Sequence, residues 1–190
     1  MIIYLTGSPA TGKTTLAERL SDRIDNLIHF RFGNVLTELI QQNHEVTQEA
    51  LRTSTSHIST PDIVNQVNEN AIETCEKHRG VGSVIVDTHA VTTEETGFRV
   101  TPMSVAQMKR LNPDAFVCLT ARPDVRAIRV KEDAKGRPLL DEEQLRTQSM
   151  LQESLVISYA AATGKPAYFM CNETTKDLSR IEAELIALIS

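Results

Sequence analysis

The stretch Gly7–Thr14 reads GSPATGKT and matches the pattern G-x-x-x-x-G-K-[ST]. It follows the apolar run MIIYL at residues 1–5 and opens segment 12–24, in which Leu, Leu and Ile recur at helical spacing. A strand, this loop and then a helix are the context that a phosphate-binding loop, or P-loop, requires. The glycines let backbone N–H groups turn inward around phosphates, and the helix N-terminus adds partial positive charge. An ordinary strand-to-helix turn is the alternative, and the surrounding pattern disfavours it.

The residues of this loop have separate roles in such a site. Lys13 can reach the β and γ phosphates of a nucleoside triphosphate, which makes it a catalytic candidate, and the hydroxyl of Thr14 can ligate Mg²⁺. We therefore expect ATP as a substrate and Mg²⁺ as its cofactor. Motor, switch and kinase proteins all carry such a loop, so the motif alone does not identify the reaction. The residues expected to bind ATP are Gly7, Ser8, Pro9, Ala10, Thr11, Gly12, Lys13, Thr14 and Thr15.

Apolar runs alternate with amphipathic segments along the whole chain. Strands are expected at residues 2–6, 26–30, 83–89, 115–121 and 166–172. Helices are expected at residues 12–24, 33–43, 60–80, 124–134, 141–164 and 176–189. Strands joined by crossover helices form a parallel sheet covered on both faces, so the predicted fold class is α/β. We expect residues 1–190 to form a single domain.

Composition narrows the range of partners. The net charge of −5 argues against a nucleic-acid partner, and no apolar run reaches the ~20 residues that span a bilayer. Cys75, Cys118 and Cys171 lie far apart, without the spacing of a disulfide framework or a zinc site. We interpret them as reduced, mostly buried thiols of a cytoplasmic protein.

A second candidate site lies at the end of the strand expected at 83–89, which reads SVIVDTH. Asp87 follows the apolar run, where a carboxylate can hold Mg²⁺ directly or through water. Thr88 and His89 come next, at the rim where ligands bind in open α/β sheets. A polar residue that merely ends a strand is the alternative for Asp87.

Arginines gather in the second half of the chain. Arg122, Arg126 and Arg129 are spaced by four and three residues, so they can share one side of a helix. Arg137 lies in the following KGRP segment, and Arg146 lies on the next expected helix. This arrangement is typical of a lid that closes over a phosphoryl group during transfer. A solvated helix face with interspersed acidic residues explains the pattern equally well.

Several motifs together resemble the archaeal-type adenylate kinases over nearly the whole chain. This resemblance implies a P-loop nucleoside monophosphate kinase that moves a phosphoryl group from MgATP to AMP. It also implies a five-stranded parallel sheet, an acceptor-binding helical segment (33–60) and a short lid (130–142). Some members form trimers, so a homo-oligomer is compatible with it. The motifs are GSPATGKTT, FRFGNVLTEL, ALRTS, VIVDTHAVTTEETGF, LNPDAF and YAAATGKPAYF.

The resemblance also implies roles by position. Gly33 would open the helix of the acceptor site, and Arg52 would be its phosphate-binding arginine. Thr88 and His89, in the DTH element, would face the acceptor. Arg129 would be the arginine at the start of the lid, and the loop after residues 166–172 would lie near the adenine of ATP. With Arg137 of the lid, Arg129 joins Lys13 as a catalytic candidate.

The chain departs from the family pattern at phosphate-handling positions. The family lid carries an Arg-x-Arg pair after its acidic residue, whereas here Asp133 is followed by a segment whose one arginine is Arg137. Glu153 lies close to the place of another family arginine. Three interpretations therefore stay open. The favoured one is a monophosphate kinase acting on AMP. The second is a small-molecule kinase with another acceptor, and the third is an ATP-binding factor with slow ATPase activity that works through a protein or RNA partner.

Overall fold

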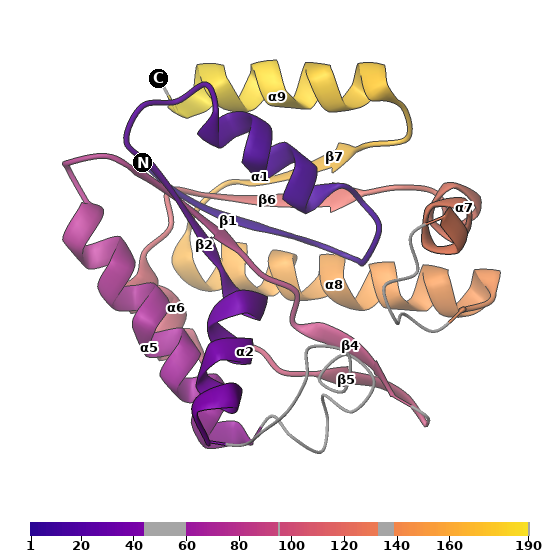
Figure 1. The fold of residues 1–190 in the computed structure, drawn as a ribbon, viewed down its shortest axis with the longest axis horizontal. Coiled ribbons are helices and arrows are strands. Elements are labelled where there is room, and N and C mark those ends of the chain that lie inside the picture. The colour runs from indigo at the N-terminus through magenta and orange to yellow at the C-terminus, as the bar shows by residue number, and fades with distance from the viewer. Residues whose placement is uncertain (44–59, 95, 133–138, 190) are drawn as a thin grey trace.

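A computed structural model describes residues 1–43, 60–94, 96–132 and 139–189 of the chain (Figure 1). Within these residues five parallel strands form one sheet in the order β2-β3-β1-β6-β7, which confirms the predicted sheet and the α/β class. Strand β1 lies in the middle, and all of its residues are buried. The strands are β1 (Ile2–Gly7), β2 (Leu27–Arg31), β3 (Ser83–Asp87), β6 (Ala115–Thr120) and β7 (Ala167–Cys171).

Helices cover both faces of the sheet, as predicted. Figure 1 shows α1 (Lys13–Ser21) and α9 (Thr175–Ile189) above it, and α5 (Pro61–His78), α6 (Val105–Leu111) and α8 (Glu142–Thr163) below it. Successive strand residues point to opposite faces. Accordingly, Ile2 and Tyr4 belong to the core between the sheet and helices α5, α6 and α8. Ile3 and Leu5 belong to the core between the sheet and helices α1 and α9.

Two more helices extend from the ends of strands. Helix α2 (Phe32–Asn43) follows β2 directly and packs on α5, where Ile40 and Ile63 form a small core with Leu36 and Leu39. Helix α7 (Pro123–Glu132) follows β6 and packs against α8. Both lie near the expected ranges.

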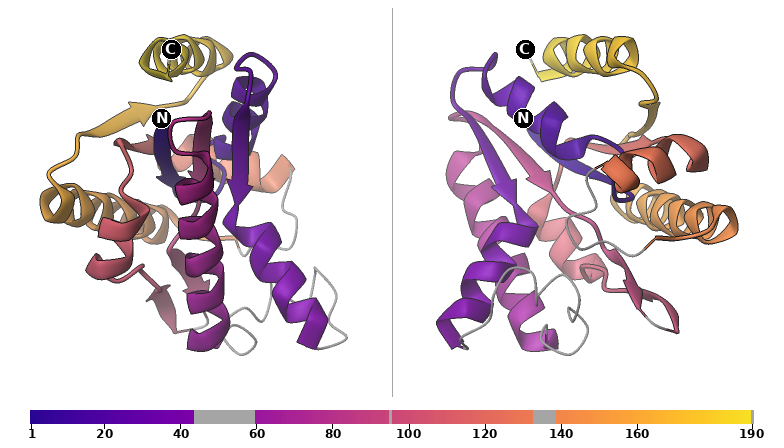
Figure 2. Two further views of the ribbon diagram at one scale, coloured as in Figure 1. Left: turned by 90° about the vertical axis from the view of Figure 1, so that its left-hand side faces the viewer. Right: turned by 45° about the vertical axis from the view of Figure 1, so that its right-hand side comes forward.

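The sequence patterns missed a hairpin and a short helix between residues 91 and 111. Strands β4 (Val91–Glu94) and β5 (Gly97–Val100) pair antiparallel and form a separate sheet. Figure 2 shows that this hairpin and α2 both project beyond the same end of the strands of the main sheet. Helix α6 follows, with a capping box formed by Ser104 and Gln107.

Some predictions fall partly or wholly outside the described residues. These are Arg52, Arg137, most of the expected acceptor segment 33–60 and the middle of the expected lid 130–142. The division into these segments therefore remains a prediction. Among the residues that the structure describes, no helix is both long and apolar enough to cross a membrane.

Candidate functional site

The loop between β1 and α1 has the backbone shape that its glycines predict. Gly7 and Gly12 have φ values of 143° and 93°, a region that L side chains rarely adopt. A Cβ atom at Gly7 would collide with the carbonyl oxygen of Leu119, and one at Gly12 with the side-chain amide of Asn172. Both positions therefore need glycine, for conformation and for space.

Lys13 lies inside the arc of this loop. Its Nζ donates to the carbonyl oxygens of Gly7 at 2.6 Å and Ser8 at 3.2 Å, and the residue is only 9% exposed. Thr11 braces the loop from within, because its hydroxyl donates to the Ser8 carbonyl at 2.9 Å. The structure thus brings the lysine to the loop that contains the other expected ATP-binding residues. Thr14 and Thr15 follow it in the first turn of α1, where both are exposed.

The end of β7 holds the same loop from the other side. The Asn172 side-chain amide donates to the carbonyl oxygen of Thr11 at 2.8 Å. Arg129 of α7 donates to three backbone carbonyls, those of Ala10, Asn172 and Glu173, at 3.0–3.2 Å. The segment expected near adenine is therefore tied directly to the P-loop.

Arg126, one turn before Arg129, is almost completely buried at 1% exposure. It donates to the carbonyl oxygens of Pro9 at 3.1 Å and Leu145 at 2.8 Å. Burial lowers the pKa of its guanidinium to about 10. The spacing predicted one helical side for three arginines, but Arg122 precedes α7 and only Arg126 and Arg129 lie on that helix. Arg126 lies in the interior, where protein groups occupy its donors. Arg122 is exposed and pairs with Asp124 and Glu173.

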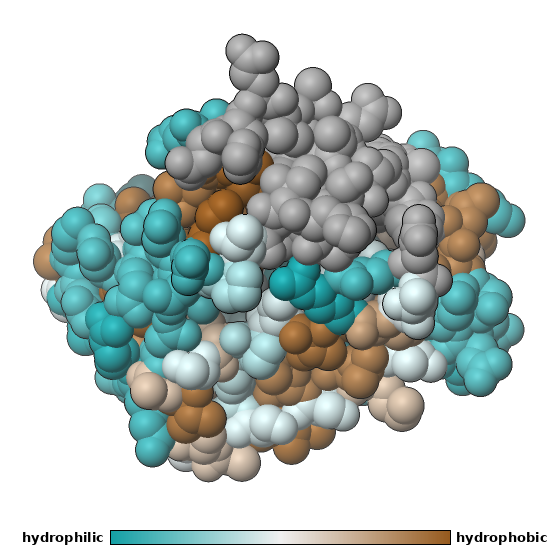
Figure 3. Space-filling view, turned by 90° about the horizontal axis from the view of Figure 1, so that it is seen from below, coloured by the Kyte–Doolittle hydropathy of each residue, from teal (hydrophilic) through white to brown (hydrophobic). Residues whose placement is uncertain are grey.

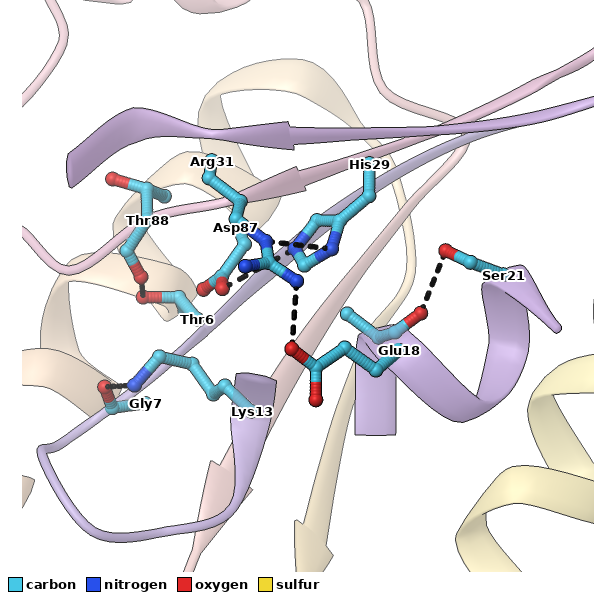
Figure 4. A network of polar contacts seen from close by, with 10 residues as sticks. Thr6, Gly7, Lys13, Glu18, Ser21, His29, Arg31, Asp87 and Thr88 are labelled. Carbon is cyan, nitrogen blue, oxygen red and sulfur yellow. Dashed lines mark hydrogen bonds and ion pairs between the residues drawn. The ribbon is translucent and has the colours of Figure 1, made fainter. Parts of the chain in front are cut away.

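Asp87 lies at the carboxyl end of β3, beside β1 and β2 (Figure 4). Arg31 Nε donates to His29 Nδ1 at 3.2 Å, which leaves the proton of a neutral His29 on Nε2, 3.4 Å from Asp87 Oδ2. Arg31 also donates to Glu18 of α1 at 2.8 Å. Burial acts to raise the pKa of Asp87. The hydrogen bond from His29, together with the charge of Lys13 and that of His89 when it is protonated, outweighs this effect, so the pKa of Asp87 lies below its ordinary value.

A carboxylate such as that of Asp87 and a hydroxyl such as that of Thr14 are oxygen ligands of the kind that Mg²⁺ takes. Asp87 stays ionised at neutral pH, and its partner on β1 is Leu5, two residues before the P-loop. Within the described residues, no group of three or more His, Cys, Asp or Glu side chains could hold a metal ion by itself.

A separate, small hollow of about 50 Å³ lies between α2, the end of β3 and the hairpin. Two residues expected at the acceptor site, Gly33 and His89, line it. Arg99 lines it as well, so the hollow has two cationic side chains when His89 is protonated. Seen from below, the visible part of the molecule has hydrophilic and hydrophobic residues side by side (Figure 3). The lining residues are Phe32, Gly33, Leu36, Val64, His89, Thr92, Arg99 and Thr101.

Thr88 is not among these lining residues. It is buried, and its carbonyl oxygen accepts a hydrogen bond from the Thr6 hydroxyl at 2.9 Å. Sequence reasoning missed both His29 and Arg99. Nothing in the sequence distinguishes His29 from other histidines, whereas the VTT and FRV stretches on either side of Gly97 are a hairpin signal that would have drawn attention to Arg99.

Comparisons with known proteins agree with this geometry. A family model described as an AAA domain matches residues 6–146. An adenylate kinase from Methanopyrus kandleri is 22% identical over 165 residues, which cover 86% of this chain and 84% of that protein. These matches confirm the adenylate-kinase resemblance seen in the motifs.

Solved structures share the fold at low sequence identity. A shikimate kinase from Bacteroides thetaiotaomicron is 18% identical with a TM-score of 0.58, and the match covers 99% of this chain and 97% of that one. A sugar kinase from Janibacter sp. HTCC2649 is 16% identical with a TM-score of 0.57, covering 97% and 94%. At such identities the likeness concerns the P-loop kinase fold alone.

Proposed function

The chain belongs to the AAA domain family, and from this premise we propose that it transfers the γ-phosphoryl group of MgATP to a nucleoside monophosphate, with AMP as the preferred acceptor. One observation carries the proposal. A P-loop and a separate hollow with two basic side chains lie at the carboxyl edge of one parallel sheet. A phosphoryl transferase needs two adjacent sites of this kind, one for the donor and one for the acceptor.

On the donor side, the P-loop N–H groups and Lys13 bind the phosphates of ATP. Thr14 and Asp87 would hold Mg²⁺, which would supply positive charge to the phosphate groups of ATP. Arg129 fixes the P-loop to the loop after β7 through the carbonyls of Ala10 and Asn172. This role adds to the catalytic role expected for Arg129 and Arg137 at the lid, residues 130–142.

On the acceptor side, His89 and Arg99 offer positive charge to a phosphate dianion, and Gly33 leaves open space at the start of α2. Arg52 of segment 33–60 would add a further fork for the phosphate. The apolar side chains of Phe32, Leu36 and Val64 suit the flat face of a base. Thr88 does not line the hollow. It supports the neighbouring His89, because its backbone carbonyl accepts a hydrogen bond from the Thr6 hydroxyl.

A second candidate acceptor is an anionic small molecule that is not a nucleotide. Arg99 favours such an acceptor, because it lines the hollow from a hairpin for which the resemblance to adenylate kinases implied no role. Two proteins of the same fold are named as a shikimate kinase and a sugar kinase. Glu153 lies close to the place of a family arginine, and this departure from the family pattern also favours another acceptor.

A donor and acceptor panel tests the proposal. The protein is incubated with MgATP and one of AMP, CMP, UMP, GMP, shikimate or glucose, and with MgATP alone, and ADP formation is followed. We expect ADP formation that depends on AMP and stops when Mg²⁺ is removed with a chelator. Shikimate- or sugar-dependent turnover would replace AMP with the second candidate. Acceptor-independent hydrolysis alone would contradict both and favour an ATP-binding factor.

A further inference from the structure

Helix α8 buries polar side chains on the side that faces the P-loop. Gln148 and Gln152 are each 1% exposed, and Ser149 lies between them. The spacing of four residues between Gln148 and Gln152 places these two on one helical face. Buried glutamines are uncommon in a helix that packs on a sheet, so the contacts of these residues need an explanation.

Gln148 has hydrogen bonds in two directions. Its side-chain oxygen accepts from Arg126, the buried arginine that also donates to the Pro9 carbonyl of the P-loop at 3.1 Å. Its side-chain nitrogen donates to the Thr93 hydroxyl of strand β4 at 3.1 Å. One continuous chain of hydrogen bonds therefore runs from Pro9 through Arg126 and Gln148 to Thr93.

The hairpin has two distinct faces. Thr92 of β4 pairs directly with Arg99 of β5, and both line the hollow. Thr93 follows Thr92, so its side chain lies on the opposite face, which is the face that Gln148 contacts. The hydrogen bond from Gln148 therefore holds the hairpin on the face opposite the hollow, and Gln148 itself does not line the hollow.

A second contact joins α8 to the same two regions. The Gln152 side-chain nitrogen donates to the Thr6 hydroxyl at 2.9 Å, and Thr6 donates to the Thr88 carbonyl at 2.9 Å. Thr6 directly precedes the P-loop, and Thr88 directly precedes His89 of the hollow. Helix α8 is thus fixed to both the loop and the hollow, and Gln148 supplies its link to the hairpin.

We propose that Gln148 is a positioning residue that couples the P-loop to the hairpin, so that ATP bound at Pro9 and its neighbours orders the wall carrying Arg99. This inference rests on the proposed function where it places an acceptor in the hollow. The coupling itself is a property of the protein and of ATP binding. Coupling between two sites is reciprocal, so an ordered hairpin also favours bound ATP.

Two substitutions break the chain at different points. Thr93→Val is nearly isosteric and removes only the acceptor of the Gln148 hydrogen bond, whereas Thr93→Ser keeps the hydroxyl. Gln148→Met keeps the length of the side chain and removes both hydrogen bonds. Tyr159→Phe is the matched control, because it removes a buried hydrogen bond of the same helix, from the Tyr159 hydroxyl to the Met103 carbonyl at 3.1 Å.

Hydrogen–deuterium exchange of β4 measures the coupling without any acceptor. In the wild-type protein, the magnesium complex of a nonhydrolysable ATP analogue is expected to slow exchange of these amides by at least about threefold. This effect disappears in Thr93→Val and Gln148→Met and persists in Thr93→Ser and Tyr159→Phe. The P-loop amides remain protected in every variant, which shows that the analogue still binds.

Steady-state kinetics with the acceptor found in the panel give the second readout. Thr93→Val is expected to lower kcat/KM for that acceptor about tenfold and to leave the ATP dissociation constant within about twofold. Absent protection of β4 in the wild type, or undiminished protection in both Thr93→Val and Gln148→Met, overturns the inference. Protection that behaves as expected, in a protein that phosphorylates no acceptor in the panel, retains the coupling and removes the proposed function.

Discussion

Lys13 is a buried cation that donates hydrogen bonds to two carbonyl oxygens of its own loop, so its removal acts first on that loop. Lys13→Ala removes bonds to Gly7 and Ser8 but leaves the sheet and its two cores intact. We expect a folded protein in which phosphoryl transfer falls by at least about 10²-fold, because charge on the β and γ phosphates is uncompensated. Circular dichroism and turnover are measured together, with Lys109→Ala as an exposed control. Wild-type turnover in the folded variant would exclude this role of the P-loop.

The cysteines differ in burial, and this predicts their reactivity. Burial raises the pKa of Cys75 to about 12 and that of Cys118 to about 12, so almost no thiolate forms in the folded protein at neutral pH. Cys171 is exposed, although partial burial and Glu173 raise its pKa as well. We expect a chromogenic disulfide reagent to label about one thiol per native chain quickly. Cys171→Ser should abolish this fast phase, and fast labelling of further thiols would contradict the burial of the other two.

Arg52 and Arg99, the two arginines proposed to bind the acceptor, are tested by the change in kcat/KM for the acceptor when each is replaced. Each hydrogen bond to a charged group contributes about 1.5–3 kcal/mol, so Arg52→Ala or Arg99→Ala should lower kcat/KM for the acceptor by about 10-fold to about 10³-fold. ATP affinity should barely change, because the P-loop lies elsewhere. Arg110→Ala, which breaks an exposed ion pair with Glu69, is the control. Equal losses for ATP and acceptor would remove the substituted arginine from the acceptor site.

Among the elements, α6 depends on local capping to an unusual degree because it has only seven residues. Ser104 Oγ accepts from the Gln107 N–H at 3.1 Å, and Gln107 Oε1 accepts from the Ser104 N–H at 3.2 Å. Ser104→Ala should therefore lower the free energy of unfolding by about 1 kcal/mol in denaturant titrations. Ser158→Ala, at an exposed position inside α8, should change it by less than about 0.5 kcal/mol. Equal effects of both substitutions would show that the cap contributes nothing.

The elements that sequence patterns predicted are those whose apolar periodicity is long. Helices α5 and α8 and the buried strands of the main sheet were predicted within a few residues, because burial on one or two faces leaves a clear pattern. The hairpin was missed because its strands have four residues each, too few for periodicity to show. Arg99 was missed with it, since its place in the hollow depends on strand pairing.

Polar residues in the interior were also beyond sequence reasoning. The spacing of Arg126 and Arg129 predicted a shared helical side, but spacing does not tell a solvent-facing arginine from a buried one. Only the packing of α7 on α8 makes Arg126 a partner of Pro9 and Gln148. The backbone shape of the loop at residues 7–12 was predicted because its glycines are required by local conformation.

At the scale of the whole molecule, residues distant in sequence meet at the carboxyl edge of one parallel sheet. The P-loop follows β1, the start of α2 follows β2, and Asp87 ends β3. Such an edge is where ligands bind in open α/β sheets. Arg129 joins the end of β7 to the same edge through the Asn172 carbonyl. The sheet therefore sets the relative positions of the proposed donor and acceptor sites, and α8 adds a hydrogen bond that holds the hairpin.

The P-loop and the hollow share no residue, so both sites should bind ligands at the same time. A nonhydrolysable MgATP analogue at 100 times its dissociation constant should stabilise the fold by about 2.7 kcal/mol. For a domain of this size that corresponds to a rise in Tm of about 5–10 °C. AMP alone should give its own rise, and both ligands together should stabilise the fold by more than the sum of their separate energies, because the coupling proposed through Gln148 is favourable. Lys13→Ala should lose most of the shift from the analogue and keep the shift from AMP. If the analogue abolished the AMP shift, AMP would be binding at the P-loop, and the hollow would lose its role as the acceptor site.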